Sequence, residues 1–336
     1  MRLPAPTVVC LTPVRDEAWI LERFLACASL WADHILIADQ GSEDASRQIA
    51  RRHPKVTLID NANSRYDEGA RQRLLIEASR AIPGRRVLVA LDADESLSAG
   101  AQDNLEWRTA LSAAPGTVIR MPWINLLPRG DMAWVPPEPI AFGFVDDGST
   151  HSGEPIHSAR VPAPLGAPSI ELSEVGVLHY QYLDEKRVRA KQRWYQCLER
   201  VEFPEKRPSE IYRQYHHMDA WPADQINRVP CESLRAFSDL GIAEVEIGHA
   251  GQDVWHRRIL ELMREHGADT FRRVDIWDVD WVAEADRLGV GFAQGSLLDP
   301  RTPIDRAALR WLGFAQPRRA STTVRAVSRS LQVVGW

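Results

Sequence analysis

The sequence predicts an α/β fold with a parallel sheet, followed by a mainly helical C-terminal region. Short, unbroken apolar runs alternate with amphipathic segments through residues 7–91. Strands covered on both faces of a parallel sheet read as continuous apolar runs, and alternation with helices is typical of βαβ units with right-handed crossovers. From about residue 210 onward, helical spacing dominates the chain.

Each predicted strand is a short apolar run that leads into polar residues. Runs of this length are typical of strands, because helices in globular proteins are usually longer. The predicted strands are Thr7–Thr12, His34–Ala38, Lys55–Asp60 and Arg86–Leu91.

Three predicted helices separate these strands. The first, within residues 16–33, carries apolar side chains spaced by three and four positions. The second, within residues 41–54, ends before Pro54, which cannot continue a helix. The third, within residues 66–84, is stopped by a Pro-Gly pair. The order of elements is therefore strand, helix, strand throughout this part of the chain.

The composition indicates an ordinary soluble globular chain. Of 336 residues, 44% are hydrophobic and 26% are charged, and the net charge of −5 gives no sign of nucleic-acid binding. The four cysteines form no CxxC pair, and the apolar patterns around Cys10 and Cys27 predict buried thiols in a reducing compartment. The first apolar run is too short for a signal peptide, and no run reaches the roughly 18 residues of a membrane span. These features predict a cytoplasmic location and do not indicate an oligomeric state.

Polar side chains follow the end of each predicted strand. Arg15 and Glu17 follow the first strand, and Asp39 follows the second. Because ligands of open α/β sheets bind beyond the carboxyl ends of the strands, these side chains predict a single site. Asp92 and Asp94 come directly after the fourth strand, at alternate positions. Two such carboxylates repel each other, and a shared Mg²⁺ or Mn²⁺ would relieve the repulsion because these cations take oxygen ligands.

Three motifs on this frame resemble one enzyme family. "TPVRDE" follows the first strand, "DQGSED" follows the second, and "LDADE" follows the fourth. In this order and at these distances, they resemble the catalytic domain of family 2 glycosyltransferases, which have the GT-A fold, a Rossmann-like nucleotide-binding sheet. The resemblance covers roughly the first 95 to 100 residues. It implies transfer of a sugar from a nucleotide-diphosphate donor, most commonly a UDP-sugar.

The resemblance implies roles for the acidic residues. Asp92, Ala93 and Asp94 form the DxD box, which in the family binds a divalent metal on the donor diphosphate and helps to hold the ribose. Such a metal neutralises the diphosphate as the sugar bond breaks. Asp39 would bind the base or the ribose of the donor. Gln40 stands where the family usually has a second aspartate, which leaves the base preference open.

The resemblance also implies further contacts with the donor nucleotide. Pro13, Arg15 and Glu17 would border the base. Arg71 or Arg73, on the third predicted helix, would approach the uracil or the phosphates, since a planar guanidinium suits phosphate oxygens. The alternative for both arginines is a solvated helix face.

The predicted domain organisation follows from this resemblance and from the change in pattern. Residues 1–182 would form the catalytic domain, with a nucleotide-sugar half over about 1–100 and an acceptor half over about 101–182. Residues 183–336 would form the helical region. Within the acceptor half we expect one strand over Gly116–Leu127, followed by a long loop region rich in Pro and Gly.

The acceptor half contains the candidates for a catalytic base and for acceptor contacts. An inverting transferase needs a carboxylate that takes the proton of the acceptor hydroxyl. Asp146, Asp147 and Glu154 are candidates, and we favour Asp147, although "DDGS" is equally typical of a solvated Asp-Gly turn. Trp134 and His157 are candidate acceptor contacts, since aromatic faces stack on sugar rings.

His179 ends a short predicted strand and is a candidate for a third metal ligand beside Asp92 and Asp94. The alternative is a structural histidine with satisfied hydrogen bonds. The C-terminal segment 316–336 has arginines, no acidic residues and apolar residues at helical spacing. It is a candidate for peripheral contact with an anionic membrane surface at the inner face, and the alternative is a helix packed on the domain.

The sequence and the resemblance thus predict a metal-dependent, inverting glycosyltransferase that acts in glycan, lipopolysaccharide, exopolysaccharide or glycosylated-metabolite biosynthesis. Its acceptor would be a sugar, a lipid-linked sugar or a small molecule. A haloacid-dehalogenase-type phosphatase is disfavoured, because its aspartate box ends the first strand of the fold and not the fourth. A methyltransferase is disfavoured because "IADQGSED" lacks a second glycine. The remaining alternative is a catalytically silent module that binds a nucleotide or a partner.

Overall fold

The computed structural model describes residues 5–336 except for 64, 230–236, 246–250, 319–320 and 334. The chain divides into two compact units. Unit 1 comprises Met1–Leu183 and Gln225–Ile247, and unit 2 comprises Asp184–Asp224 and Gly248–Trp336. The sequence analysis did not predict the return of the chain to unit 1 at Gln225.

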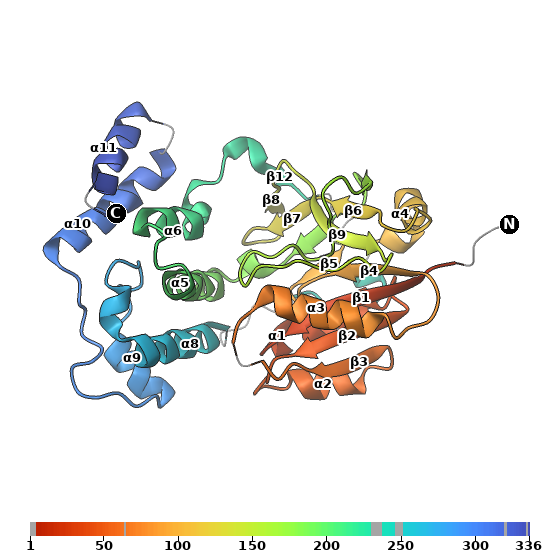
Figure 1. Cartoon of the computed structure of the whole chain (residues 1–336), viewed down its shortest axis with the longest axis horizontal. Helices are drawn as coiled ribbons and strands as arrows, with labels where there is room; N and C mark the ends of the chain where they lie inside the picture. Colours follow the sequence, from red (N-terminus) through yellow and green to blue (C-terminus); the bar gives the residue numbers. More distant parts are fainter. Residues whose placement is uncertain (1–4, 64, 230–236, 246–250, 319–320, 334) are drawn as a thin grey trace. The chain divides into compact units, whose positions relative to one another are not determined.

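The predicted alternation of strands and helices forms the first half of unit 1 (Figure 1). All four predicted strands and all three predicted helices are confirmed, with small shifts at their ends. The strands pair in parallel, with β1 between β4 and β2, and β3 beyond β2. The elements are β1 (Thr7–Val14), α1 (Ala18–Ala28), β2 (His34–Asp39), α2 (Ser46–Arg52), β3 (Val56–Asp60), α3 (Glu68–Ser79) and β4 (Arg86–Ala90).

Helices cover both faces of this parallel sheet. Alternate residues of each strand belong to two separate hydrophobic clusters. Cys10 packs in the cluster that contains Phe24 of α1 and Ile49 of α2, whereas Leu11 packs in the cluster that contains Leu75 of α3. The α/β fold class is therefore as predicted. Cys10 and Cys27 are buried as expected, and burial raises the pKa of the Cys10 thiol to about 12 and that of Cys27 to about 11.

Three further strands extend this sheet beyond β4, in the order β10-β6-β9-β4-β1-β2-β3. They are β6 (Val118–Met121), β9 (Ile140–Val145) and β10 (Ser169–Glu171). Strand β9 runs antiparallel to both of its neighbours, β4 and β6. The sequence analysis placed β9 in a loop region, because its apolar run follows several prolines.

The single strand predicted over Gly116–Leu127 is in fact two strands in different sheets. β6 belongs to the large sheet, and β7 (Trp123–Leu126) belongs to a second sheet with the order β12-β8-β7-β11-β5. The break falls at Pro122, which has no backbone N–H to donate to a ladder. The other strands of the second sheet are β5 (Glu95–Leu97), β8 (Met132–Trp134), β11 (Val177–His179) and β12 (Ile226–Arg228).

Among the described residues, the rest of unit 1 also contains a further α-helix before β6 and short helical turns. The helix is α4 (Leu105–Leu111), whose N-cap Asn104 accepts hydrogen bonds from two backbone N–H groups. The 3₁₀ turns are η1 (Ala101–Asp103) and η2 (Gln181–Leu183).

Unit 2 is helical, as the sequence predicts for this part of the chain. Helix α5 packs along α8 and α6. The α-helices are α5 (Glu185–Glu202), α6 (Pro208–Tyr215), α8 (Gly251–His266), α9 (Trp281–Leu288), α10 (Pro303–Ala315) and α11 (Thr322–Val333). The 3₁₀ turns include η3 (His217–Ala220), η5 (Ala268–Phe271) and η6 (Gln316–Arg318), and η4 (Ala223–Gln225) spans the boundary between the units.

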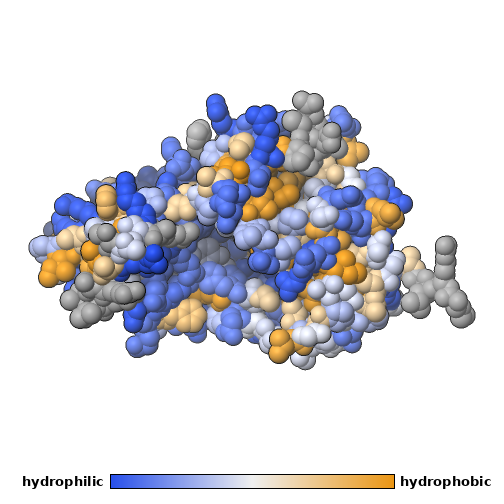
Figure 2. Space-filling model, turned by 90° about the horizontal axis from the view of Figure 1, so that it is seen from above, coloured by the Kyte–Doolittle hydropathy of each residue, from blue (hydrophilic) through white to orange (hydrophobic). Residues whose placement is uncertain are grey.

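The C-terminal segment packs into unit 2. Trp336 is 1% exposed and belongs to a hydrophobic cluster with Tyr212, Leu309 and Leu312. This packing matches the alternative considered for the segment, a helix on the domain. Among the described residues, no helix is long and apolar enough to cross a membrane. On the face drawn in Figure 2, hydrophilic residues cover most of the surface and hydrophobic residues form separate patches.

Candidate functional site

The acidic box, which comprises residues 92–95, lies where the chain passes from the first sheet to the second. Strand β4 ends at Ala90, and Glu95 begins β5 of the second sheet. The turn between them is closed by a hydrogen bond from the Glu95 N–H to the Asp92 carbonyl oxygen, 3.0 Å long. Asp94 and Glu95 are buried and Asp92 is half-buried. Negative charge is therefore concentrated at the carboxyl end of β4, where the sheet topology predicts a ligand site.

Three strands of the second sheet align functional side chains in one row. Glu95 of β5 pairs with His179 of β11, and His179 pairs with Asn125 of β7. Directly paired residues project to the same face of a sheet, so these side chains become neighbours. The Trp123 ring, two positions before Asn125, stacks on the His179 imidazole with centroids 4.8 Å apart. The row is a product of strand pairing between segments that are distant in sequence.

His179 lies beside Asp94 with a defined orientation. Its Nδ1 is 2.8 Å from Asn125 Oδ1, and the Asn125 amide nitrogen donates to the Trp123 carbonyl oxygen. This chain of bonds assigns a proton to Nδ1 and leaves the Nε2 lone pair toward Asp94. The distance from Nε2 to Asp94 Oδ2 is 3.7 Å. Two groups of acceptor character at this distance favour a cation between them, and metal-binding histidines typically donate their other ring N–H to an oxygen that fixes the ring orientation.

Arg160 is the partner of the other acidic side chains. Its two terminal nitrogens donate to both oxygens of Glu95, at 2.7 and 2.9 Å, and to Asp92 Oδ2 at 3.1 Å. Glu95 also accepts bonds from Trp123 Nε1 and from the Asp92 N–H, each 2.8 Å long. Burial raises the pKa of Glu95, and the charge of Arg160 acts in the opposite direction. All four bonds are donated to Glu95, which fits its ionised form.

A small pocket opens beside this cluster at the carboxyl end of the parallel strands. Its lining combines residues of β1, α3 and the acidic box with Arg160. The predicted donor contacts Pro13 and Asp92 both line it, together with Gln72 of α3. The His151 imidazole is 3.1 Å from the Gln72 amide oxygen, so the loop that contains Arg160 also supports this wall.

Asp39 is buried and carries one carboxylate oxygen that can accept a ligand. Its Oδ2 accepts from Arg47 Nη1 at 2.5 Å and from the Ser42 N–H at 3.3 Å. Its Oδ1 is buried and has no hydrogen-bond partner within the described part of the chain. A buried unpaired acceptor is costly, and the N–H of a nucleobase or the hydroxyl of a ribose would satisfy it. Gln40 donates to the carbonyl oxygens of Asn63 and Arg65 and so anchors the loop after β3.

Arg15 and Glu17 lie in the loop after β1, at the edge where the sequence places them. The Arg15 side chain is 33% exposed and lies 3.9 Å from Asp16. Glu17 precedes α1, accepts from Trp19 Nε1 at 2.6 Å, and receives support from Ser46, whose hydroxyl accepts from the Glu17 N–H. Their contact with a nucleotide base stays a prediction.

Arg71 and Arg73 both project from α3 toward neighbouring protein groups. Arg71 donates to the Tyr66 hydroxyl at 3.2 Å, and its guanidinium lies over the Tyr66 ring. Arg73 donates to the Gly153 carbonyl oxygen at 3.4 Å and is exposed. Arg71 is the better placed for a buried role, because its side chain is only 15% exposed.

The structure does not bring Asp147 to this site. Strand β9 runs antiparallel to β4, and Val145 at its end pairs with Val87 at the start of β4. Asp147 therefore lies at the amino end of β4. Six residue steps separate Arg86 from Asp92, and at about 3.3 Å for each step the two edges are about 20 Å apart. This position contradicts the prediction of Asp147 as the catalytic base. The Asp147 Oδ1 accepts a hydrogen bond from the Ser149 N–H, in the solvated Asp-Gly turn that was the alternative interpretation.

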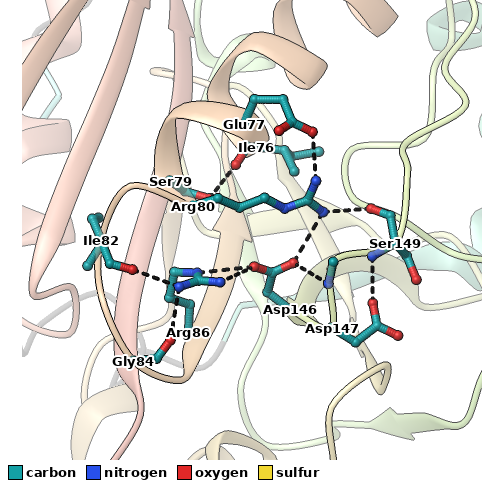
Figure 3. Close-up of polar contacts among 11 residues, drawn as sticks. Ile76, Glu77, Ser79, Arg80, Ile82, Gly84, Arg86, Asp146, Asp147 and Ser149 are labelled. Atoms are coloured by element: carbon teal, nitrogen blue, oxygen red, sulfur yellow. Dashed lines mark hydrogen bonds and ion pairs between the residues drawn. The ribbon is translucent and has the colours of Figure 1, made fainter.

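Neighbouring Asp146 has a structural role at that edge (Figure 3). It is buried and accepts from Arg86 at 2.9 Å and from Arg80 at 3.3 Å. Burial opposes the ionisation of Asp146, but the bonds from Arg86, the Gly148 N–H and Arg80 outweigh it and lower the pKa. Asp146 is therefore also excluded as the base.

Glu154 and His157 lie in the Arg160 loop, which we define as residues 151–161. This loop crosses the N-terminal end of α3, where the Gly69 N–H donates to the Glu154 carbonyl oxygen at 3.0 Å. Both side chains are exposed, and His157 has a positive φ of 60°. Because the loop starts beside α3 and reaches the acidic box through Arg160, Glu154 stays a candidate base and His157 a candidate acceptor contact.

Trp134 lies at the end of β8 in the second sheet. It pairs with Ile226 of β12, and its Nε1 donates to Gln225 Oε1 at 3.0 Å. The side chain is half-buried. Its predicted contact with the acceptor is not tested by this position.

The sequence analysis missed Arg160 as a site residue. It stands in "HSARVP", within a Pro-rich stretch that has neither strand nor helix periodicity. Glu95 was visible beside the DxD box, but its pairing with Arg160 depends on a contact across 65 positions of the sequence. The available signal was the excess of negative charge after β4, which requires a buried cation from elsewhere in the chain.

A divalent metal fits the pair of ligands formed by Asp94 and His179. One carboxylate oxygen and one imidazole nitrogen, 3.7 Å apart, can ligate a divalent cation, and the nitrogen ligand favours Mn²⁺ over Mg²⁺, which takes oxygen ligands. Among the described residues, no group of three or more His, Cys, Asp or Glu side chains is placed to hold a metal. The remaining positions would be filled by water and by the phosphates of a bound donor, which is usual for Mg²⁺ in nucleotide sites. Asp92, predicted as a ligand, is instead paired with Arg160.

Comparisons with known proteins give partial structural likenesses. No family model and no curated protein matches the chain. Glucosyl-3-phosphoglycerate synthase from Mycobacterium tuberculosis, in complex with Mn²⁺, UDP and glucosyl-3-phosphoglycerate, is 16% identical with a TM-score of 0.27, over 35% of this chain and 44% of that chain. GalNAc-T7 with UDP, GalNAc and Mn²⁺ is 18% identical with a TM-score of 0.29, over 44% of this chain and 27% of that chain. For 4-diphosphocytidyl-2C-methyl-D-erythritol synthase the identity is 12% and the TM-score 0.27, over 43% of this chain and 74% of that chain. The matched region thus spans less than half of the length of the first two proteins.

Proposed function

We propose that the protein is a metal-dependent glycosyltransferase that uses a nucleotide-diphosphate sugar, with a UDP-sugar as the first donor to test. The donor would lie at the carboxyl ends of β1, β2 and β4. Its anomeric C–O bond to the diphosphate breaks, a new C–O bond forms to an acceptor hydroxyl, and the hydroxyl proton passes to a base. Inversion at the anomeric carbon, with Glu154 as the base, is the form of the reaction that we propose.

The observation that carries this proposal is the pairing of Asp94 and His179. Their facing oxygen and nitrogen are 3.7 Å apart, and the bond from His179 Nδ1 to Asn125 keeps the Nε2 lone pair on that side. This arrangement supports a divalent cation held by two protein ligands. A cation held in this way would bind strongly only when phosphate oxygens complete its coordination. When bound, it would neutralise the charge that develops on the leaving diphosphate.

Two further features support a nucleotide donor. The buried Asp39 Oδ1 lacks a partner in the described structure, at the end of the strand next to β1. The pocket between Pro13, Gln72 and Asp92 lies on the same edge. We assign Asp39 to the base or ribose of the donor.

The test is thermal stability with nucleotides, with and without Mn²⁺. A ligand that binds only the folded state stabilises it by mass action and so raises the melting temperature. At a ligand concentration of 100 times the Kd, the stabilisation is about 2.7 kcal/mol. We expect a rise with UDP and Mn²⁺ together that exceeds the sum of the separate effects. Without such a rise for UDP or for any other nucleoside diphosphate, the proposal fails.

A catalytically silent nucleotide-binding module is the second candidate, because the favoured base Asp147 lies at the opposite edge of the sheet. Slow release of UDP from UDP-glucose and other UDP-sugars, with water as acceptor, separates the two. Metal-dependent UDP release supports the transferase. Nucleotide binding with no release, also in the presence of acceptor sugars, supports the silent module.

A further inference from the structure

Arg160 is an internal positive charge inside the acidic box. Its guanidinium lies over two aromatic rings, 4.9 Å from the Phe142 centroid and 5.8 Å from the Trp123 centroid. It binds Glu95 through both carboxylate oxygens and reaches Asp92 with the same nitrogen that serves one of them. The bonds from both terminal nitrogens, together with these ring contacts, orient the planar guanidinium.

The charges of the cluster add to a value that one divalent cation can neutralise. Asp92, Asp94 and Glu95 contribute three negative charges, and Arg160 contributes one positive charge. The remaining charge of −2 equals the charge of one Mg²⁺ or Mn²⁺ with opposite sign. Without Arg160, the same turn would hold a charge of −3 and would expose Asp92 to the cation.

Arg160 also has donors left for a ligand. A guanidinium has five N–H groups, and the bonds to Glu95 and Asp92 use three of them. Arg160 lines the same pocket as Asp92 and Pro13. An arginine edge that faces a pocket beside a metal site suits the oxygens of a diphosphate.

The loop that carries Arg160 is held firmly against α3. The Glu68 N–H donates to the Pro155 carbonyl oxygen at 2.9 Å, and the Ser158 N–H donates to Glu68 Oε2 at 3.0 Å. At Gly69, an added Cβ would lie 2.5 Å from the backbone of Gly153. The loop therefore presents Arg160 from a fixed position on unit 1.

We propose that Arg160 is the built-in cation of the donor site, which withholds Asp92 from the metal and binds the donor diphosphate. Arg160 thereby limits the box to a single divalent ion and makes tight binding of that ion depend on the nucleotide. Arg160 is a positioning residue toward Asp92 and a direct contact of the phosphate oxygens. This inference rests on the proposed function, because it needs a diphosphate donor.

The experiment compares two affinities in Arg160→Gln and in the wild type. Mn²⁺ binding without nucleotide is measured from the free Mn²⁺ signal in electron paramagnetic resonance, and UDP binding at saturating Mn²⁺ by calorimetry. We expect Mn²⁺ alone to bind roughly 10-fold more tightly to the variant, because a positive charge is removed beside the ion. We expect UDP to bind about 10-fold more weakly, because charge-assisted bonds are lost. A purely structural role would weaken both.

Two further variants keep the inference testable if Arg160→Gln does not fold. The double variant Arg160→Gln with Glu95→Gln removes the buried ion pair together and leaves the box at −2. It should bind Mn²⁺ alone at least as tightly as the wild type, because Asp92 is released while the net charge stays at −2, and it should bind UDP about 10-fold more weakly. Arg108→Gln, an exposed arginine on α4, is the control and should change neither affinity.

The outcomes separate the two proposals. Wild-type UDP affinity in both Arg160 variants, with Mn²⁺-dependent UDP binding intact in the wild type, overturns the role of Arg160 and leaves the proposed function standing. Loss of Mn²⁺ affinity in Arg160→Gln also overturns it, because competition for Asp92 predicts a gain. If the wild type itself binds no UDP with Mn²⁺, both proposals fail.

Discussion

Replacement of Gly69 by alanine tests the contact that holds the Arg160 loop against α3. A Cβ at this position would lie 2.5 Å from both the carbonyl carbon and the carbonyl oxygen of Gly153. Because both are backbone atoms, the clash can be relieved only by movement of the loop. Over-packing of this kind costs about 1–3 kcal/mol, and alanine in a helix regains about 1 kcal/mol. Weakening of the bond from the Gly69 N–H to Glu154 adds about 1 kcal/mol, so we expect a net loss of about 1–3 kcal/mol.

The assay for Gly69→Ala combines urea unfolding, followed by circular dichroism, with UDP binding in the presence of Mn²⁺. Glu77→Ala on the same helix is the control, because Glu77 is exposed and its ion pair with Arg80 contributes at most about 0.5 kcal/mol. Gly69→Ala should unfold at lower urea and bind UDP more weakly, since the loop that carries Arg160 must shift. Stability and UDP affinity equal to those of Glu77→Ala would refute the reasoning.

Three further predictions concern single side chains. Asp94→Asn should abolish the Mn²⁺-dependent part of UDP binding, seen by calorimetry, and retention of it would exclude Asp94 as a ligand. Asp146→Asn should lower the urea midpoint by an amount equivalent to about 2–4 kcal/mol, because it removes the charge of the buried carboxylate that pairs with Arg80 and Arg86, whereas the exposed Asp147→Asn should have little effect. In unit 2, hydrogen bonds from Arg287 lower the pKa of Glu284 from 4.5 to about 2. The stabilisation of the folded state by ionised Glu284 is therefore complete above pH 4.5, and it is lost as the pH falls toward 2. Glu284→Gln should be less stable than the wild type by about 1 kcal/mol at pH 7, and urea titrations should show this difference shrinking below pH 4.5.

The parallel half of unit 1 could be predicted from the sequence because its signals are local. Each strand is an apolar run, and each helix ends at a proline or glycine or at a change of periodicity. The edge that holds Asp39 and Asp92 follows from topology alone, since parallel strands bring their carboxyl ends together. His179 was a candidate from the sequence because it ends a predicted strand.

The remainder of the site depends on contacts that leave no local signal. The split at Pro122 sends β6 and β7 to different sheets, and the antiparallel direction of β9 decides that Asp147 lies far from Asp92. Arg160 reaches Glu95 from a loop without periodicity. In each case, contacts between segments that are distant in sequence determine which side chains meet. A short window of sequence carries no information about these contacts.

The discontinuous course of unit 1 has a consequence for its synthesis. Strand β12, at residues Ile226–Arg228, pairs with β8 and completes the second sheet only after the chain has built the first helices of unit 2. Domains generally fold as units during translation, from the N-terminal end. The β12 side of β8 therefore stays unpaired until about 45 further residues beyond Leu183 have left the ribosome. A fragment that ends at Leu183 would keep that edge permanently exposed, and exposed strand edges favour aggregation.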